Sequence, residues 1–538
     1  MGVRNFTPER IHEKRWWILV ALCTSLVVIS IDTTVLNVAL PTIQNDLDAS
    51  NTDLQWIVDG YTLVFASLLL TMGSLGDRFG RNHFLVFGLC VFGTFSLLSG
   101  FTETPGQLIT TRVIQGVGGA AIMPSTLSIL MNVFQDEVER ERAISIWAAV
   151  TGAGVALGPI VGGGLIAIFD TWEPVFWINV PIVIAALIMG YFLVPASKDP
   201  NAPRIDIVGA VMATAGLFGV VFGIIESSTA PNGWADITVL GPLIGGFAII
   251  AAFIFWEIRS NHPMLDVRLF KNMRFTAANL ALVLIFFGLM GGIYVLTQYL
   301  QDVQGFSAFD AGVRTLPMSL GIMIFAPISA RVDMRIGSKL TVAGALAVMV
   351  AGFVMASFFE VDTEYWYVAI AIALLGFSMG MAMTPGTNSI MGALPPEKAG
   401  VGSATNDTTR QVGGTLGVAI LGAILTKLYA SNLDKKLDTL PEDVQEKIEP
   451  VRSTLETSVD SAVTLGEKAI EEGAPAAYVD QVVAFAKEAF VDGQRLAYIV
   501  AAAFALVGVI TTALWLPSRS SGASTMLPPD ANGVAPGD

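Results

Sequence analysis

GSLGDRFGRN, residues 73–82, separates two apolar stretches near 54–75 and 83–100 and holds three glycines and three charged side chains. Each apolar stretch approaches the roughly 20 residues that an α-helix needs to cross a membrane. The glycines permit a tight reversal of the chain, and the charged side chains can pair across helix ends or with a helix dipole. We predict a gating turn between two spanning helices, with a basic turn of no further role as the simpler alternative. Its residues are Gly73, Gly76, Gly80, Asp77, Arg78 and Arg81.

The rest of the chain repeats this alternation of apolar stretches and polar connections. Of its 538 residues, 53% are hydrophobic and 14% are charged, whereas a soluble domain has about 25% charged residues with which to cover its surface. Most of the surface must therefore face lipid, and we predict an all-α membrane protein with fourteen transmembrane helices. The apolar stretches lie near 17–40, 54–75, 83–100, 107–131, 143–168, 175–195, 206–226, 238–258, 275–299, 311–332, 338–358, 366–391, 401–427 and 496–516.

Among the short connections, Lys and Arg occur only in alternate ones. Basic residues concentrate on the cytoplasmic side of membrane proteins. This pattern and the even number of spans predict a multi-pass protein of the plasma membrane with both termini in the cytoplasm. The connections with Lys or Arg are 76–82, 132–142, 196–205, 259–274, 331–339 and 392–400, and those with neither are 42–53, 101–106, 169–174, 227–237, 300–310 and 359–365.

One long connection, residues 428–492, is polar and helix-prone, with 14 acidic and six basic residues. Long loops cross the membrane regardless of their charge, so we expect a small extracytoplasmic helical insertion. Residues 1–16 are predicted to form a cytoplasmic N-terminus. The composition of residues 517–538 predicts a disordered cytoplasmic tail.

An internal repeat, a common feature of secondary transporters, relates the two halves of the chain. Its simplest interpretation is a six-helix bundle over 17–195, two accessory helices over 206–258, and a second bundle over 275–516 that contains the insertion. The matching pairs are Arg78 with Arg335 and Gly80 with Gly337 at a separation of 257, and Gly119 with Gly380, Pro124 with Pro385 and Gly152 with Gly413 at 261.

Ionisable side chains inside the apolar stretches are the candidate transport residues. Such groups are costly in a membrane and usually mark ion or substrate pathways. Asp32, Asp59 and Arg112 lie at similar depth in the first bundle, so we predict that they interact. We also predict that they bind a proton whose movement is coupled to transport. The alternative for Arg112 is a structural ion pair. Asp407 and Glu226 lie separately and are candidates for binding a cationic substrate, although the preferred interpretation of Glu226 is that it reaches the membrane interface.

GVALGPIVGG, residues 154–163, concentrates small residues on one predicted helix. Glycines about four apart let two helices touch at the backbone, and a proline softens or bends a helix. Packing alone therefore explains the motif in part. Its residues are Gly154, Gly158, Pro159, Gly162 and Gly163.

These motifs resemble those of the major facilitator superfamily, and in particular its fourteen-helix drug:proton antiporters, closest to bacterial quaternary-ammonium and multidrug exporters. The resemblance rests on 73–82 and 154–163 and on DTTVLNVALP (32–41), WIVDGYTL (56–63), RVIQGVGGA (112–120), FWINVP (176–181), QYLQDVQG (298–305) and GVGSATNDTTRQVGG (400–414).

The resemblance implies two six-helix bundles plus two accessory helices, a link between RVIQGVGGA and proton coupling, and a link between GVALGPIVGG and efflux. Two departures are visible in the chain. Asn82 stands where the family usually has Lys or Arg, and WEPVF at 172–176 lacks the usual basic residue and second Trp.

Catalytic chemistry is not expected. The three histidines, His12, His83 and His262, are unclustered, and without a Gly-Lys dipeptide there is no P-loop. We therefore expect no enzyme activity, no cofactor, no ATP and no nucleic acid, with the proton gradient as the energy source. The expected partners are a small-molecule substrate, protons and the lipid bilayer, and the expected state is a monomer.

The predicted function is a proton-coupled efflux antiporter for small lipophilic, cationic drugs. Two alternatives remain open at this point. One is a dedicated exporter of an endogenous lipid, siderophore or peptide, and the other is a membrane sensor that transports nothing.

Overall fold

The computed structural model describes residues 7–49, 51–197, 206–227, 230, 233–260, 263–265, 267–394, 398–471 and 474–517. Within these ranges every regular element is a helix, and each of the fourteen predicted apolar stretches coincides with one or two helices. The predicted tail at 517–538, apart from Pro517, lies outside the described residues, as do residues 1–6 of the predicted N-terminus.

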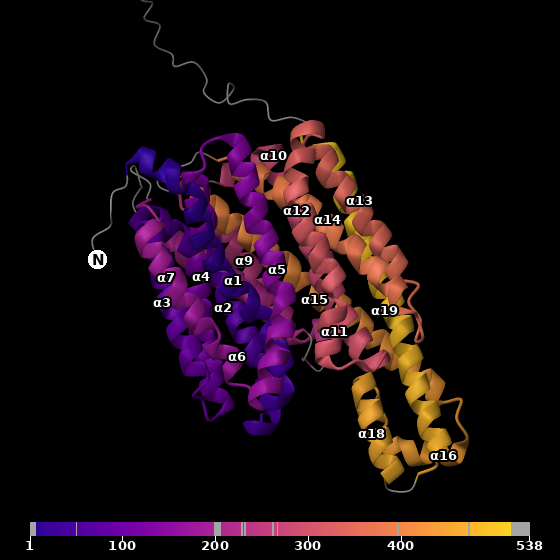
Figure 1. Cartoon of the computed structure of the whole chain (residues 1–538). Coiled ribbons are helices and arrows are strands. Elements are labelled where there is room, and N and C mark those ends of the chain that lie inside the picture. Colours follow the sequence, from indigo (N-terminus) through magenta and orange to yellow (C-terminus); the bar gives the residue numbers. More distant parts are fainter. Residues whose placement is uncertain are drawn as a thin grey trace, which may run out of the picture.

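The first half of the chain forms six spans, coloured indigo to magenta on one side of Figure 1. Polar side chains fix several helix starts, as when Thr104 accepts a hydrogen bond from the Gln107 amide and Asp136 from the Glu139 amide, which satisfies amides that have no partner inside the helix. The spans are α1 (Pro8–Asp46), α2 (Asn51–Phe79), α3 (Arg81–Ser99), α4 (Pro105–Val133), α5 (Glu137–Phe169), and α6 (Pro174–Trp177) followed by α7 (Asn179–Leu193).

The second half forms six further spans on the opposite side of Figure 1. They are α10 (Met273–Gln298), α11 (Ala308–Arg314) followed by α12 (Leu316–Ile336), α13 (Ser338–Ala356), α14 (Tyr365–Met391), α15 (Ala399–Leu437) and α19 (Ala476–Trp515). A five-residue π-helical turn, Tyr299–Val303, continues α10.

Membrane dimensions agree with this arrangement. Thirteen helices in the described part of the chain are long and apolar enough to cross a membrane. The fourteenth is α5, a 33-residue helix whose stretch Ile160–Phe169 is apolar and which packs against α1. The predicted all-α membrane fold is therefore confirmed, with thirteen helices of spanning length and composition in the described part of the chain and α5 as the remaining predicted span.

The internal repeat is visible in the backbone. Gly80 and Gly337 precede α3 and α13 with φ of 115° and 85°, values that residues with a Cβ rarely adopt. Pro124 lies inside α4 and Pro385 inside α14. Each half therefore reverses its chain with the same kind of glycine turn at the same point.

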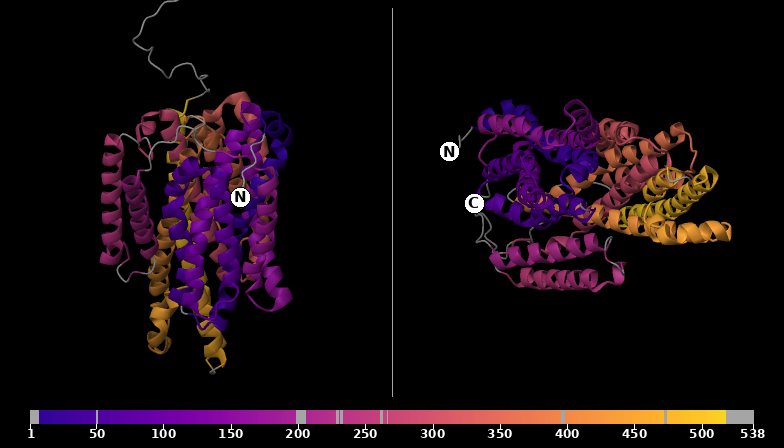
Figure 2. Two further views of the ribbon diagram at one scale, coloured as in Figure 1. Left: turned by 90° about the vertical axis from the view of Figure 1, so that its left-hand side faces the viewer. Right: turned by 90° about the horizontal axis from the view of Figure 1, so that it is seen from below.

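Two accessory helices, α8 (Ile207–Glu226) and α9 (Ile237–Arg259), form a hairpin beside the two halves (Figure 2). Val221 of α8 packs against Leu63 and Ala66 of α2. On the same helix, Val220 and Ile224 pack with Ala419 of α15. Because α2 belongs to the first half and α15 to the second, α8 contacts both halves at once.

The predicted insertion at 428–492 is helical and projects from one end of the molecule, opposite the beginning of α1 and the end of α19 (Figure 1). We call these ends the insertion face and the terminal face. Helix α15 continues past its predicted end to Leu437, and α19 begins before its predicted start, at Ala476. Between them in the chain lie α16 (Glu442–Ile448), α17 (Arg452–Leu455) and α18 (Val459–Glu471).

Arg452 connects the short helix α17 to the end of α15. It donates hydrogen bonds to Asp438, at 2.6 Å, and to Asp434 near the end of α15, and these two carboxylates raise the pKa of its guanidinium. Tyr429 adds a hydrogen bond of 2.8 Å from its hydroxyl to the Leu455 carbonyl. These hydrogen bonds tie α17 to the extension of α15.

Candidate functional site

The turn at 73–82 ties the two halves together at the terminal face. Asp77 Oδ1 accepts hydrogen bonds from Arg81 Nε at 2.7 Å and from the Gly400 amide at 2.9 Å, and Oδ2 accepts one from the Val401 amide at 3.1 Å. Gly400 and Val401 belong to the first turn of α15, where amides lack partners inside the helix and an anion is favourable. The carboxylate of Asp77 therefore caps a helix of the opposite half.

Small residues and the neighbouring charges support this contact. A Cβ on Gly73 would lie 2.6 Å from the Gly400 carbonyl oxygen, so the backbones of α2 and α15 touch there. Arg81 also donates to Ser197 Oγ at 3.1 Å, and the Arg78 guanidinium lies 5.8 Å from the centre of the Phe79 ring. Gly80 supplies the positive φ of the turn.

A second contact crosses between the halves at the same face. The Asn388 side-chain amide of α14 donates to Glu141 Oε1 of α5 at 3.0 Å. Both residues are buried. Polar contacts between α2 and α15 and between α5 and α14 therefore join the two halves at the terminal face.

Asp32 and Arg112 form a fully buried ion pair inside the first half. Arg112 Nη1 donates to Asp32 Oδ2 at 2.7 Å, and both side chains are 1% exposed. Gln115 Nε2 and Asn179 Nδ2 each donate to Asp32 Oδ1 at 3.0 Å. Because a buried ion pair is stable only when its remaining polar atoms are also paired, these amides explain how the pair is tolerated.

The guanidinium of Arg112 has further partners. Its Nη1 also donates to Gln115 Oε1 at 2.9 Å, and its Nε donates to the Ile57 carbonyl of α2 at 3.3 Å. The Tyr61 ring lies below it, with the guanidinium carbon 4.5 Å from the ring centre, an arrangement that favours a cation. The network thus joins α1, α2, α4 and α7.

Asp59 lies on α2 but shows no contact with the Asp32–Arg112 pair among the described interactions. Its side chain shares a hydrogen bond with Gln55 on the same helix. Of the three residues grouped from the sequence, only Asp32 and Arg112 are thus seen in direct contact.

Asp407 also pairs with an arginine, in the second half. Arg410 Nη1 lies 3.8 Å from Asp407 Oδ1, a looser contact than in the first half. Asn406 donates to Asp407 Oδ1 at 3.0 Å, and Arg410 Nη2 donates to Thr387 Oγ1 at 3.0 Å. Asp407 Oδ2 and Arg410 Nε are buried without a hydrogen-bond partner, so this pair retains unused donor and acceptor capacity.

Aromatic rings of both halves surround Arg410. Its guanidinium carbon lies 5.0 Å from the Trp147 ring centre and 5.4 Å from that of Phe286. Trp147 belongs to α5 of the first half, and its indole nitrogen donates to Thr126 Oγ1 of α4 at 3.2 Å. The Asp407–Arg410 pair therefore lies at the boundary between the halves.

The glycine motif of α5 packs in two directions. A Cβ on Gly162 would lie 2.9 Å from Val35, and Cβ atoms on Gly154 and Gly158 would collide with Ser30 and Thr34, all on α1. Gly163 instead faces Phe309 of α11, 3.0 Å from a built Cβ. The side chain of Pro159 lies outside what the structure describes.

Glu226 ends α8 and is half-buried. Its neighbour Ile224 packs with Ala419, which is twelve residues beyond Asp407 on α15, or about 18 Å along the helix. Asp407 and Glu226 are thus well apart, at different depths.

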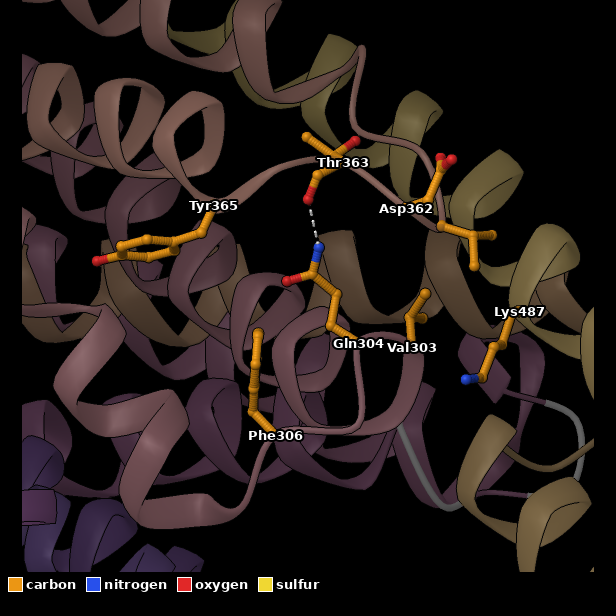
Figure 3. A pocket seen from close by; sticks show the side chains of 8 residues that line it. Val303, Gln304, Phe306, Asp362, Thr363, Tyr365 and Lys487 are labelled. Atoms are coloured by element: carbon orange, nitrogen blue, oxygen red, sulfur yellow. Dashed lines mark hydrogen bonds between the residues drawn. The ribbon is translucent and has the colours of Figure 1, made fainter.

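A pocket opens on the surface near the insertion face, and the hydrogen bond from Gln304 Nε2 to the Thr363 carbonyl, 2.8 Å, spans it (Figure 3). None of the residues that line it belongs to either charged pair. Its lining residues are Val303, Gln304, Phe306, Val361, Asp362, Thr363, Tyr365 and Lys487.

The sequence did not identify the groups that surround Asp32, Arg112 and Asp407, among them Gln115, Arg410, Asn179 and Trp147. Gln115 and Arg410 each lie three residues beyond a residue that was singled out, a separation that places side chains on one face of a helix. Asn179 belongs to FWINVP, which was noted only for its resemblance. Trp147 comes from the opposite half, and no local pattern in the sequence indicates it.

Comparisons with known proteins agree with this architecture. The family model described as Major Facilitator Superfamily matches residues 22–418. The multidrug efflux pump LfrA of Mycolicibacterium smegmatis is 36% identical over 510 residues, 94% of this chain and 98% of the relative. The tetracenomycin C resistance and export protein of Streptomyces glaucescens is 32% identical over 94% of this chain and 92% of its own length.

The methyl viologen resistance protein SmvA of Salmonella typhimurium is 34% identical over 78% of this chain and 84% of its own length. Among solved structures, the human organic anion transporter MFSD10 matches with a TM-score of 0.58 at 11% identity, over 94% of this chain and 100% of its own. At that identity the likeness is one of fold. The family match over most of the chain, with relatives above 30% identity along nearly all of it, means that the chain belongs to the major facilitator superfamily, a family of transporters and not of enzymes.

Proposed function

We propose that this protein is a proton-coupled antiporter that exports small lipophilic cations across the plasma membrane. The observation that carries the proposal is the presence of two buried carboxylate–arginine pairs, one inside the first half and one at the boundary between the halves. Intramembrane charges of this kind usually lie on proton or substrate pathways.

In this proposal the coupled proton binds in the first half. Asp32 is the primary site, Arg112 is its counter-charge, and Asp59 is a second candidate. Asp32 lies away from the boundary between the halves, in a network closed by Gln115 and Asn179. A proton can exchange there without direct competition from a bulky substrate.

The substrate in this proposal meets the Asp407–Arg410 pair. Asp407 Oδ2 has no partner, and the rings of Trp147 and Phe286 lie beside the arginine. A carboxylate next to aromatic faces suits an aromatic or quaternary cation. Such a cation would replace Arg410 as the partner of the Asp407 carboxylate. Glu226 is kept as a secondary candidate near the insertion face.

The names of the relatives point in the same direction. They include a multidrug efflux pump and a resistance protein for methyl viologen, which is a quaternary bipyridinium dication. The tetracenomycin C export protein favours a second candidate function, a dedicated exporter of one natural product, with the same coupling mechanism.

Transport would proceed by alternating access, in which the two halves rock about a site near the membrane midplane. With the termini in the cytoplasm, the contacts of Asp77 and Glu141 would close the cytoplasmic entrance. Moving one charge against 100 mV costs about 2.3 kcal/mol. Exchange of two or more protons for each monovalent cation moves net positive charge inward, and the membrane potential would then drive export more strongly than in one-for-one exchange. A monomer is sufficient for this cycle, and no cofactor or ATP takes part.

The test is ethidium efflux in everted membrane vesicles, with and without an uncoupler. We expect gradient-driven efflux that the uncoupler stops, and loss of uphill efflux in both Asp32→Asn and Asp59→Asn at unchanged expression. Full gradient-driven efflux in both variants would remove these residues from the mechanism.

A second measurement addresses the substrate site. Asp407→Asn should weaken transport of monocations such as ethidium about tenfold or more, as expected for loss of a charge-assisted contact, while neutral drugs are affected less. If all substrates lose transport equally, or if only neutral and anionic compounds are exported, the cation assignment is wrong and the dedicated exporter is favoured.

A further inference from the structure

Asn179 occupies a fully buried position between Asp32 and the third helix. It is the first residue of α7, separated from the short helix α6 by Ile178 alone, and it comes from the segment FWINVP. Its Nδ2 donates to Asp32 Oδ1 at 3.0 Å and to Ser96 Oγ at 3.0 Å. Ser96 in turn donates to the Phe176 carbonyl at 2.8 Å.

In all of its described hydrogen bonds Asp32 is the acceptor. Arg112 Nη1, Gln115 Nε2 and Asn179 Nδ2 each donate to one of its two oxygens. An ionised carboxylate is an acceptor only, whereas a protonated carboxyl group also has an O–H that must find an acceptor. The arrangement observed is therefore that of ionised Asp32, and a protonated Asp32 needs an acceptor that these three donor groups do not provide.

Two side chains that donate to Asp32, Gln115 and Asn179, also carry an amide oxygen that can accept a hydrogen bond. Gln115 Oε1 already accepts from Arg112 Nη1 at 2.9 Å. Asn179 Oδ1, by contrast, is buried without a hydrogen-bond partner. Rotation of the Asn179 amide by a half-turn about its Cβ–Cγ bond would exchange Oδ1 and Nδ2 and present an acceptor to the carboxyl group.

We infer that Asn179 is a positioning residue that serves both protonation states of Asp32, donating to the carboxylate and, after rotation of its amide, accepting from the carboxyl group. The inference rests on the proposed function, in which Asp32 binds the coupled proton. The proton itself bonds only to Asp32, and no covalent bond of Asn179 changes.

Through this rotation, protonation of Asp32 changes hydrogen bonds on neighbouring helices. Once Oδ1 faces Ser96, the serine hydroxyl can turn away from the Phe176 carbonyl and donate to Asn179. The Phe176 carbonyl lies at the junction of α6 and α7, and its hydrogen bond from α3 is then lost. Proton binding in α1 thereby alters a contact between α3 and α6.

The titratable groups that face Asp32 are Arg112 of α4 and the neutral Tyr61 of α2, and the charges of Asp32 and Arg112 both act on the Tyr61 hydroxyl. From α3 and α7 the network receives the neutral Ser96 and Asn179. The Tyr61 hydroxyl is buried without a partner as well, so it is the competing acceptor that an experiment must separate from Asn179.

The first experiment measures proton release on ethidium binding to the purified transporter, with a pH-sensitive dye, as a function of pH. In Asn179→Leu we expect the midpoint of release to move to higher pH by about one unit, a tenfold change, because the lost bond to the charged form is the stronger one. Asn179→Ser keeps a donor and an acceptor, and its midpoint should stay near that of the wild type. Ser25→Ala is the matched control, since Ser25 is a buried hydroxyl of α1 bonded to its own helix at the Ala21 carbonyl.

The second experiment records the carboxylic acid C=O stretch by infrared difference spectroscopy, assigned through its loss in Asp32→Asn. Asn179→Leu should move this band to higher frequency, because the O–H loses its acceptor, and Tyr61→Phe should leave it in place. If Asn179→Leu changes neither the midpoint nor the band, or if Tyr61→Phe moves the band instead, the inference is wrong. If the wild type releases no proton on binding drug, the proposed proton coupling itself fails, which is a separate result.

Discussion

Asp32 and Asp407 each lie beside an arginine, but their carboxylates differ in the number of donors that they meet. Asp32 accepts from three side chains at 2.7–3.0 Å. Asp407 has one oxygen without a partner and an arginine 3.8 Å away. Because buried charges are costly unless fully paired, the first site stabilises an ionised carboxylate and must rearrange its hydrogen bonds when that carboxylate binds a proton. The second site has the capacity to accept a new partner.

The pairing of Asp32 with Arg112 leads to a prediction about stability. Arg112→Met leaves a buried carboxylate without its counter-charge and should lower the free energy of unfolding by about 3–5 kcal/mol. Arg112→Met combined with Asp32→Asn should cost less than Arg112→Met alone, because no buried charge is then left unpaired. Thermal unfolding of the purified protein in detergent measures both, and strictly additive effects would contradict the pairing.

At this scale the sequence predicts which residues carry charge in the membrane but not which neighbours satisfy them. Asp32 and Arg112 can be recognised as costly charges inside apolar stretches, and they are indeed in contact. Asn179 and Trp147 could not be identified in this way, because an amide and an aromatic ring are ordinary residues for a buried helix. Their roles come from α7 and α5 lying against other helices.

At the scale of helices, α5 has two packing faces. Gly154, Gly158 and Gly162 let its backbone approach α1, whereas Gly163 packs against Phe309 of the other half. Small residues allow helices in membranes to pack closely. One helix therefore keeps a fixed partner within its half and a second partner across the boundary, which must separate if the halves rock.

Gly158 and Gly164 provide a matched pair of substitutions on this helix. A Cβ at Gly158 would collide with Thr34, whereas a Cβ at Gly164 has nothing within 4 Å. We expect Gly158→Ala to lower stability by about 1–3 kcal/mol, as overpacking does, and to reduce efflux. Gly164→Ala should be neutral or slightly stabilising. Thermal unfolding and ethidium efflux of the two variants give the comparison, and equal effects would show that α1 and α5 do not pack as described.

At the scale of the whole molecule, the distribution of Lys and Arg predicts the side on which each connection lies. In a background without Cys23 and Cys90, we expect Thr104→Cys and Ser453→Cys to react with a membrane-impermeant thiol reagent in intact cells. Ser338→Cys should react only after the cells are opened. Labelling of Ser338→Cys in intact cells would reverse the proposed orientation.

The fold as a whole was more predictable than its polar contacts. Apolar stretches of spanning length recur along the chain, and all of them coincide with helices. The boundaries were less accurate at the insertion, where α15 and α19 continue beyond their apolar parts. A hydropathy pattern reports where a helix meets lipid, and it does not indicate where a helix ends in water.

The hairpin α8–α9 has a consequence for how such a chain can be enlarged. The glycine turns at Gly80 and Gly337 occupy equivalent places in the two halves, so both halves must enter the membrane from the same side. A segment inserted between them keeps this parity only if it crosses the membrane an even number of times. Two helices are the smallest addition that meets the condition, and a single added helix would invert the orientation of the entire second half in the membrane.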